Sequence, residues 1–155
     1  PVNIAIPSDF VVCAIANNGY LIQPQIIDST STSTGEINYV ESKTIRQVIS
    51  KQTATKLKSM MESVVTDGTG KFAAVKGYSV GGKSGTSEPT ASNIESGYIA
   101  SFAGISPIEN TEVVVLVTLY DPQGVSFQGG QTAGPIVANI LNEILPYLGI
   151  EPDQN

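Results

Sequence analysis

The chain has 155 residues, of which 41% are hydrophobic and 14% are charged, and its formal net charge is −6. This length suffices for one domain with a hydrophobic core, and the acidic balance argues against nucleic acid or an anionic membrane as a partner. The chain has no histidine and a single cysteine, Cys13. Histidine-based catalytic triads and Cys/His zinc sites are therefore excluded. No apolar run reaches the length of a transmembrane helix.

The first third of the sequence predicts a short helix followed by a β-hairpin. The helix spans residues 7–16 and stops at Asn17-Asn18-Gly19, a sequence typical of a left-handed helix end. Its apolar face comprises Phe10, Val11, Ala14 and Ile15. Residues 20–28 and 36–42 are predicted to be extended arms, and the Ser/Thr run closed by a glycine at 29–35 is predicted to be their polar tip.

Two longer amphipathic helices are predicted further along the chain. The first is capped by Ser50 or Thr53 and runs to about Val65, and the second runs over residues 132–148 with Pro135 in its first turn. The apolar stripe of the first comprises Leu57, Met60, Met61, Val64 and Val65. The stripe of the second comprises Ile136, Val137, Ile140, Leu141, Ile144, Leu145 and Leu148. Both methionines are expected to lie in the core.

Three segments between these helices read as strands, at residues 78–86, 98–106 and 112–120. The last is almost wholly apolar, which is typical of a strand covered on both faces. Because the connections are short, adjacent antiparallel pairing is the simplest topology, and the apolar stripes of the helices have the sheet as their available surface. The sequence therefore predicts an α+β fold, an antiparallel sheet with helices packed on it. A polar loop is expected at 88–96.

The most informative stretch is Gly81-Gly82-Lys83-Ser84-Gly85-Thr86-Ser87, which places one lysine and three hydroxyl groups among glycines. Glycine lets the backbone approach another molecule closely, and a cation with hydroxyl donors suits a carboxylate or a phosphate. One interpretation is a glycine-rich turn with a solvated lysine. A second is a phosphate loop, and a third is the lysine motif of a serine acyl-transferase.

The phosphate-loop interpretation rests on residues 77–84, which satisfy the pattern G-x-x-x-x-G-K-[ST]. Such a loop must follow a strand and open a helix, whose N-terminus binds the phosphates. The residues that follow, Gly85-Thr86-Ser87-Glu88-Pro89, cannot open a long helix, and 72–76 is weak as a core strand. The context therefore disfavours this alternative.

Lys83-Ser84-Gly85 is the serine form of the K-T-G motif of penicillin-recognising enzymes, and other segments agree with it. They are Ile4-Ala5-Ile6-Pro7, Asn17-Asn18-Gly19, Gly68-Thr69-Gly70-Lys71, Tyr98-Ile99-Ala100-Ser101-Phe102-Ala103-Gly104, Gly129-Gly130, Ala133-Gly134-Pro135 and Tyr147-Leu148-Gly149-Ile150. In this order they resemble the C-terminal half of the transpeptidase domain of a class B penicillin-binding protein. The closing Gly-Ile-Glu-Pro-Asp is similar to the exit of sporulation and division transpeptidases of Gram-positive bacteria.

The resemblance implies serine-based acyl transfer from the D-Ala-D-Ala end of a peptidoglycan stem peptide, which β-lactams mimic, and it implies no cofactor. Lys83 would contribute positive potential, and the hydroxyls of Ser84 and Thr86 would bind the terminal carboxylate. The backbone N–H of Thr86 would be one oxyanion donor. Gly85 would let substrate lie against the strand as an added β-strand, and Ser87 would line the same groove.

No S-x-x-K and no S-x-N occurs in these residues; Thr53-Ala54-Thr55-Lys56 has the first spacing but begins with threonine. We therefore expect residues 1–155 to be the C-terminal portion of a single transpeptidase domain, catalytically inactive alone because nucleophile and base act together. The resemblance implies a parent at the extracytoplasmic face of the bacterial membrane, of which this chain is a soluble piece.

Several expectations follow about partners and about other classes of function. The missing N-terminal half should leave apolar surface exposed, which favours dimerisation or strand exchange. The alternative class is a non-catalytic binding or assembly module of the same fold, which the absence of S-x-x-K favours. A piece of a D,D-carboxypeptidase or a β-lactamase would share the lysine motif but fits its flanks less well.

Overall fold

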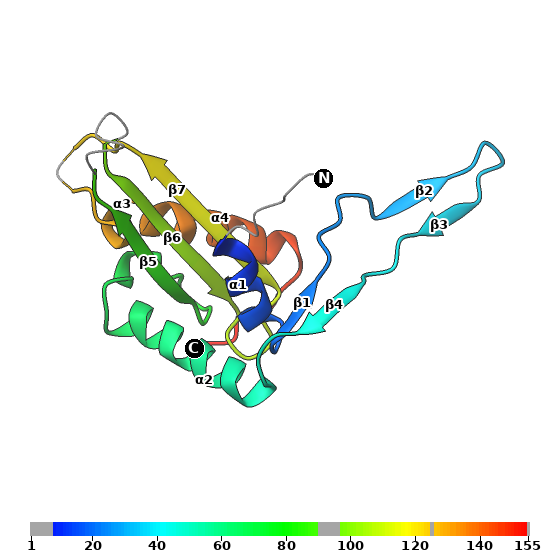
Figure 1. The fold of residues 1–155 in the computed structure, drawn as a ribbon, viewed down its shortest axis with the longest axis horizontal. Helices are drawn as coiled ribbons and strands as arrows, with labels where there is room; N and C mark the ends of the chain where they lie inside the picture. Colours follow the sequence, from blue (N-terminus) through cyan, green and yellow to red (C-terminus); the bar gives the residue numbers. More distant parts are fainter. Residues whose placement is uncertain (1–7, 90–96, 125, 155) are drawn as a thin grey trace.

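The computed structural model describes residues 8–89, 97–124 and 126–154 (Figure 1). The predicted helix start at Pro7, the Ile4–Pro7 motif and most of the polar loop predicted at 88–96 lie outside these residues. Within them, no helix is long and apolar enough to cross a membrane.

The centre of the molecule is an antiparallel sheet of β5 (Gly81–Ser87), β6 (Ile99–Ser106) and β7 (Val113–Tyr120), in that order. The predicted pairing of neighbouring strands is confirmed. However, β5 starts three residues later than predicted, at Gly81. The prediction that β7 is covered on both faces is wrong, since Leu116 is 37% exposed. β7 is an edge strand of this sheet, and Val115 and Val117 pack under α4 while the opposite face is only partly covered.

Helices cover the sheet from both sides (Figure 1). On one side lies α4 (Gly134–Tyr147), whose Val137, Leu141 and Leu145 are fully buried. On the other side lie α1 (Ser8–Ala16) and α2 (Lys51–Thr66), which form a second cluster with β6 and the turn after it. The buried members of this second cluster are Ala16, Met61, Ile105 and Ile108. The predicted α+β architecture with helices packed on the sheet is confirmed.

Glycines allow the sheet to pack tightly against its neighbours. A Cβ on Gly104 would lie 2.6 Å from a side-chain carbon of Val137, so α4 approaches the sheet where β6 has no side chain. The ring of Phe102 fills the space beside Gly82 and Gly70, where added Cβ atoms would lie 2.3 and 2.9 Å from it. A fully buried aromatic ring therefore joins β6, β5 and the loop that follows α2.

The helix predicted to run to about Val65 is α2, and Ser50 caps it: the Ser50 side chain accepts a hydrogen bond of 3.1 Å from the backbone N–H of Thr53. Its buried face is rotated relative to the predicted stripe. Met60 is 63% exposed, so its assignment to the core is wrong, whereas Met61 is buried as predicted. The buried face consists of Ala54, Lys58, Met61 and Val65. A lysine thus occupies a position that hydropathy alone assigns to the surface.

The predicted hairpin forms a two-stranded ribbon that projects from the rest of the molecule (Figure 1). At its base β1 (Tyr20–Ile22) pairs with β4 (Thr44–Gln47), and further out β2 (Ser29–Ser31) pairs with β3 (Ile37–Tyr39). Side chains of residues 22–48 are all exposed. The Ser/Thr run was predicted to be wholly tip, but its first three residues form β2. The preceding helix ends as predicted, with Asn18 at φ 55° and Gly19 at φ 93°.

Candidate functional site

The lysine motif lies on strand β5, at an edge of the sheet. Among the described strands β5 pairs only with β6, so its other edge is available for an added strand. A phosphate loop would instead place Lys83 at the start of a helix. Because Lys83 lies inside a strand, that alternative fails. The interpretation as a simple turn fails for the same reason.

The candidate residues alternate between the two faces of β5. Lys83 and Gly85 lie opposite Ala103 and Ser101 of β6, on the face that carries α1 and α2. Lys83 is exposed, and its ammonium donates a hydrogen bond to the carbonyl of Ser84. The side chain of Lys83 and the hydroxyls of Ser84 and Thr86 therefore lie on opposite faces of β5. The exposed Ser87 lies at the end of β5.

The half-buried Ser84 faces the glycine loop that follows α2. Its Oγ lies 3.3 Å from Oγ1 of Thr69, close enough for a hydrogen bond in either direction. A Cβ on Gly70 would lie 2.9 Å from the Phe102 ring, so the loop can approach the sheet only with glycine there. Thr69 therefore belongs to the site, although no role was predicted for it. Its place between two glycines, in a motif already noted for its resemblance, was the available signal.

Thr86 contacts a different element, the short helix α3 (Gly129–Thr132). The N–H of Gly129 donates a hydrogen bond of 3.2 Å to Oγ1 of Thr86. Added Cβ atoms would lie 2.1 Å from the Ser101 carbonyl oxygen at Gly129, and 2.1 Å from the Thr69 carbonyl oxygen at Gly130. The glycine pair therefore lets α3 sit directly against β5, β6 and the glycine loop. Residues 129–131, which precede the start of the helix predicted at 132–148, are helical as well.

Three motifs that are far apart in the sequence thus meet around Ser84 and Thr86. The Thr86 oxygen already accepts from Gly129, so its own proton can be donated outwards. Two hydroxyl donors on the strand that also carries an exposed ammonium suit a carboxylate. Among the residues that the structure describes, no group of three or more His, Cys, Asp or Glu side chains could hold a metal ion.

Comparison with known proteins identifies the family of this chain. The model of the penicillin-binding-protein transpeptidase domain matches residues 11–142. The chain belongs to this family. The resemblance read from the motifs is confirmed, as are the α+β fold and the sporulation- or division-type affinity.

The relatives of this transpeptidase-family chain are longer proteins. It is 39% identical to stage V sporulation protein D of Bacillus subtilis over 150 residues, which are 93% of this chain and 23% of that protein. The structure of the TP domain of Burkholderia pseudomallei penicillin-binding protein 3 is similar with a TM-score of 0.78 at 34% identity, covering 95% of this chain and 43% of that one. Mycobacterium tuberculosis penicillin-binding protein 3, solved in complex with ampicillin, gives a TM-score of 0.78 at 26% identity, covering 95% and 35%.

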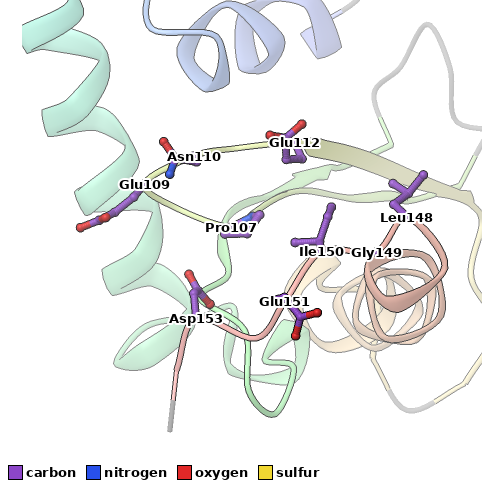
Figure 2. A pocket seen from close by; sticks show the side chains of 9 residues that line it. All are labelled: Pro107, Glu109, Asn110, Glu112, Leu148, Gly149, Ile150, Glu151 and Asp153. Atoms are coloured by element: carbon purple, nitrogen blue, oxygen red, sulfur yellow. The ribbon is translucent and has the colours of Figure 1, made fainter.

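A separate cavity of about 600 Å³ lies at the opposite end of the sheet, between the β6–β7 turn and the C-terminal tail (Figure 2). It shares no residue with the site around Ser84 and Thr86. Its lining comprises Pro107, Glu109, Asn110, Glu112, Leu148, Gly149, Ile150, Glu151 and Asp153. No sequence motif predicted this cavity.

Proposed function

We propose that this chain supplies the substrate-binding strand of a peptidoglycan D,D-transpeptidase. The observation that carries the proposal is the presence of Lys83, Ser84 and Thr86 on the open-edged strand β5 in a chain of the transpeptidase family. The substrate would be the D-Ala-D-Ala end of a stem peptide, and β-lactams would occupy the same place. The names of relatives from Neisseria flavescens, a probable peptidoglycan D,D-transpeptidase, and from Chlorokybus atmophyticus, a peptidoglycan D,D-transpeptidase homolog, support this reaction class.

Residues 83–87 of the strand would contribute different interactions. The hydroxyls of Ser84 and Thr86 would hold the terminal carboxylate, with Lys83 supplying positive potential beside it. The N–H of Thr86 would donate to the oxyanion, and a donor of this kind lowers a barrier by about 3 kcal/mol in serine proteases. Gly85 would allow the peptide to lie along the edge, and Ser87 would line the end of the groove.

The nucleophile is proposed to lie outside these residues. No serine here is followed by lysine at the third position, so residues 1–155 would form the C-terminal portion of the domain and be inactive alone. The parent would act at the extracytoplasmic face of the membrane. The chain covers 23% of the Bacillus subtilis relative and 43% of the Burkholderia pseudomallei TP-domain structure, which supports its being a portion of a longer protein.

The N-terminal portion would also need a surface to pack against. An apolar groove lies between α1, the base of the ribbon and α2, and its lining includes Val11, Ile15 and Leu57. We propose that the N-terminal portion covers this groove, and that without it the chain self-associates or exchanges strands. Sedimentation at high protein concentration tests this, and a monodisperse monomer would contradict it.

Intact mass after exposure to penicillin tests the division of the site. We expect no adduct on native or denatured chain, because the nucleophile is absent. A stoichiometric adduct on the native chain alone would show that a competent serine lies within these residues.

Reversible binding tests the recognition half. Titrating ampicillin should shift the amide resonances of residues 83–87. Thr86→Val should weaken the affinity obtained from this titration by about ten-fold, as expected for loss of a hydrogen bond to a charged group. Thr30→Val, a threonine on the exposed ribbon, is the matched control. Equal shifts in wild type and Thr86→Val would contradict the assigned role.

The second candidate function is a non-catalytic binding or assembly module, favoured by the absence of S-x-x-K from these residues. The coding region upstream of Pro1 decides between the two. An S-x-x-K followed by an S-x-N supports the transpeptidase, and their absence there supports the module.

A further inference from the structure

The C-terminal tail is fastened to the segment that leads into β5. The backbone N–H groups of Asp153 and Gln154 both donate to the carbonyl of Gly77, at 3.0 and 3.1 Å. The phenol of Tyr78 donates to the carbonyl of Ile150 at 2.9 Å. A stretch of tail thus lies beside residues that precede the lysine strand, although more than 70 positions separate them in the sequence.

The tightest point of this contact is the carboxylate of Asp153. Its Oδ1 accepts a hydrogen bond of 2.6 Å from the backbone N–H of Ser79, and its Oδ2 accepts a hydrogen bond from the Ser79 hydroxyl. Both acceptor atoms therefore serve one residue. Hydrogen bonds to an ionised acceptor are shorter and stronger than neutral ones.

Ser79 in turn connects the tail to the turn between β6 and β7. Its hydroxyl oxygen accepts from the backbone N–H of Ile108 at 2.9 Å, and its carbonyl accepts from the hydroxyl of Ser106 at 2.8 Å. Ser79 is only 6% exposed, so water cannot easily replace these partners. The backbone N–H, hydroxyl and carbonyl of Ser79 are all engaged, two positions before β5 begins at Gly81.

Asp153 stands at the edge of the cavity between tail and turn, on the side facing Glu109 and Pro107 (Figure 2). Strand β5 pairs with one strand in the described sheet, so its position depends strongly on how its first residues are held. The geometry points to Asp153 as a positioning residue for the substrate-binding strand. It fixes Ser79 against the β6–β7 turn, and through Ser79 it sets where Lys83 and Ser84 stand.

The role in substrate binding rests on the proposed function of β5. The fastening, meaning the contact of Asp153 with Ser79, can be measured whether or not that function holds. Asp153→Asn keeps the shape of the side chain while replacing one acceptor oxygen by an NH₂ donor, which cannot accept from Ser79. We expect Asp153→Asn to speed amide hydrogen exchange at residues 79–85 by about ten-fold, the effect of losing one charge-assisted hydrogen bond. Amides of α4 around Leu141 should keep their rates.

Glu151→Gln is the matched control, since it removes the same charge from the same tail at the edge of the same cavity. It should leave exchange at 79–85 unchanged. Ser79→Ala should speed exchange as Asp153→Asn does, and the double variant should be no faster than the faster single variant if the two residues act as one contact. Additive effects, equal rates in Asp153→Asn and wild type, or a uniform increase that includes α4 would each overturn the fastening.

The link to function is read by ampicillin titration of the same proteins. Weaker shifts at residues 83–87 in Asp153→Asn than in wild type, with Glu151→Gln unchanged, support the positioning role. Equal shifts in all three overturn the positioning role while leaving the proposed function intact. Absence of shifts in wild type overturns the proposed function, and with it the role of Asp153 in binding, while the exchange rates still decide the fastening.

Discussion

Replacing Gly129 with alanine should destabilise the chain at the point where α3 meets the sheet. The new Cβ would lie 2.1 Å from the carbonyl oxygen of Ser101 and 2.5 Å from that of Gly85, whereas ordinary contact begins at 3.4 Å. Both obstacles are backbone atoms of paired strands, so neither can rotate away. Either α3 must withdraw by about 1 Å or β5 and β6 must separate at this end.

The cost has two parts. Forcing an extra methyl group into a packed site costs about 1–3 kcal/mol. Withdrawal of α3 also lengthens the 3.2 Å hydrogen bond from Gly129 to Thr86, which contributes about 0.5–1.5 kcal/mol. We expect a loss of about 2–4 kcal/mol in the free energy of unfolding. For a chain of this length, that lowers the melting temperature by about 5–15 °C.

Denaturant unfolding followed by circular dichroism measures this loss, and Gly134→Ala provides the control. At Gly134 the nearest atom to an added Cβ is 3.7 Å away, and the residue begins α4. That variant should change stability by less than about 0.5 kcal/mol. If Gly129→Ala is as stable as Gly134→Ala, the close approach of α3 to the sheet is wrong.

Four further substitutions test α2 by the same assay. Met61→Ala should cost about 2–5 kcal/mol because Met61 is buried, whereas Met60→Ala should cost less than about 0.5 kcal/mol; equal losses would contradict the rotated face. Ser50→Ala should cost about 1 kcal/mol through loss of the helix cap, and an unchanged midpoint would refute the cap. Burial, aided by Lys51, lowers the pKa of Lys58 below its ordinary value of 10.5. Between the lowered pKa of Lys58 in the folded chain and 10.5, the unfolded chain binds more protons than the folded one. The free energy of unfolding therefore increases with pH over this range. The stability difference between wild type and Lys58→Met should therefore shift in favour of wild type over that range, and a constant difference would contradict it.

Much of the fold was predictable because local rules and packing agree along most of the chain. The cap at Ser50, the left-handed stop at Gly19 and the order of the three strands all follow from residues close in sequence. The predictions for Met60 and β7 failed for one reason: hydropathy gives the period of an apolar face but not which neighbour covers it. Lys58 is buried because its ammonium reaches the Glu109 carbonyl at 2.9 Å, a partner 51 positions away.

The sequence predicted which residues form the site, but not which residues hold them in place. Lys83, Ser84 and Thr86 stand together in the sequence, so spacing and hydroxyl chemistry sufficed to single them out. The residues that orient them come from elsewhere: Thr69 lies 15 positions before Ser84, and Gly129 lies 43 after Thr86. No periodicity links positions so distant. Only the folded sheet brings them together.

The exposed ribbon has a practical consequence for handling this protein. The side chains from residue 22 to residue 48 are all exposed, and its strands contain three or four residues each. Opening it locally should therefore require little free energy, which makes it the preferred point of attack for proteases. A cut near Gly35 should leave the two halves associated through α1, α2 and the sheet. The same tip should accept an inserted epitope or fluorescent label without disturbing β5.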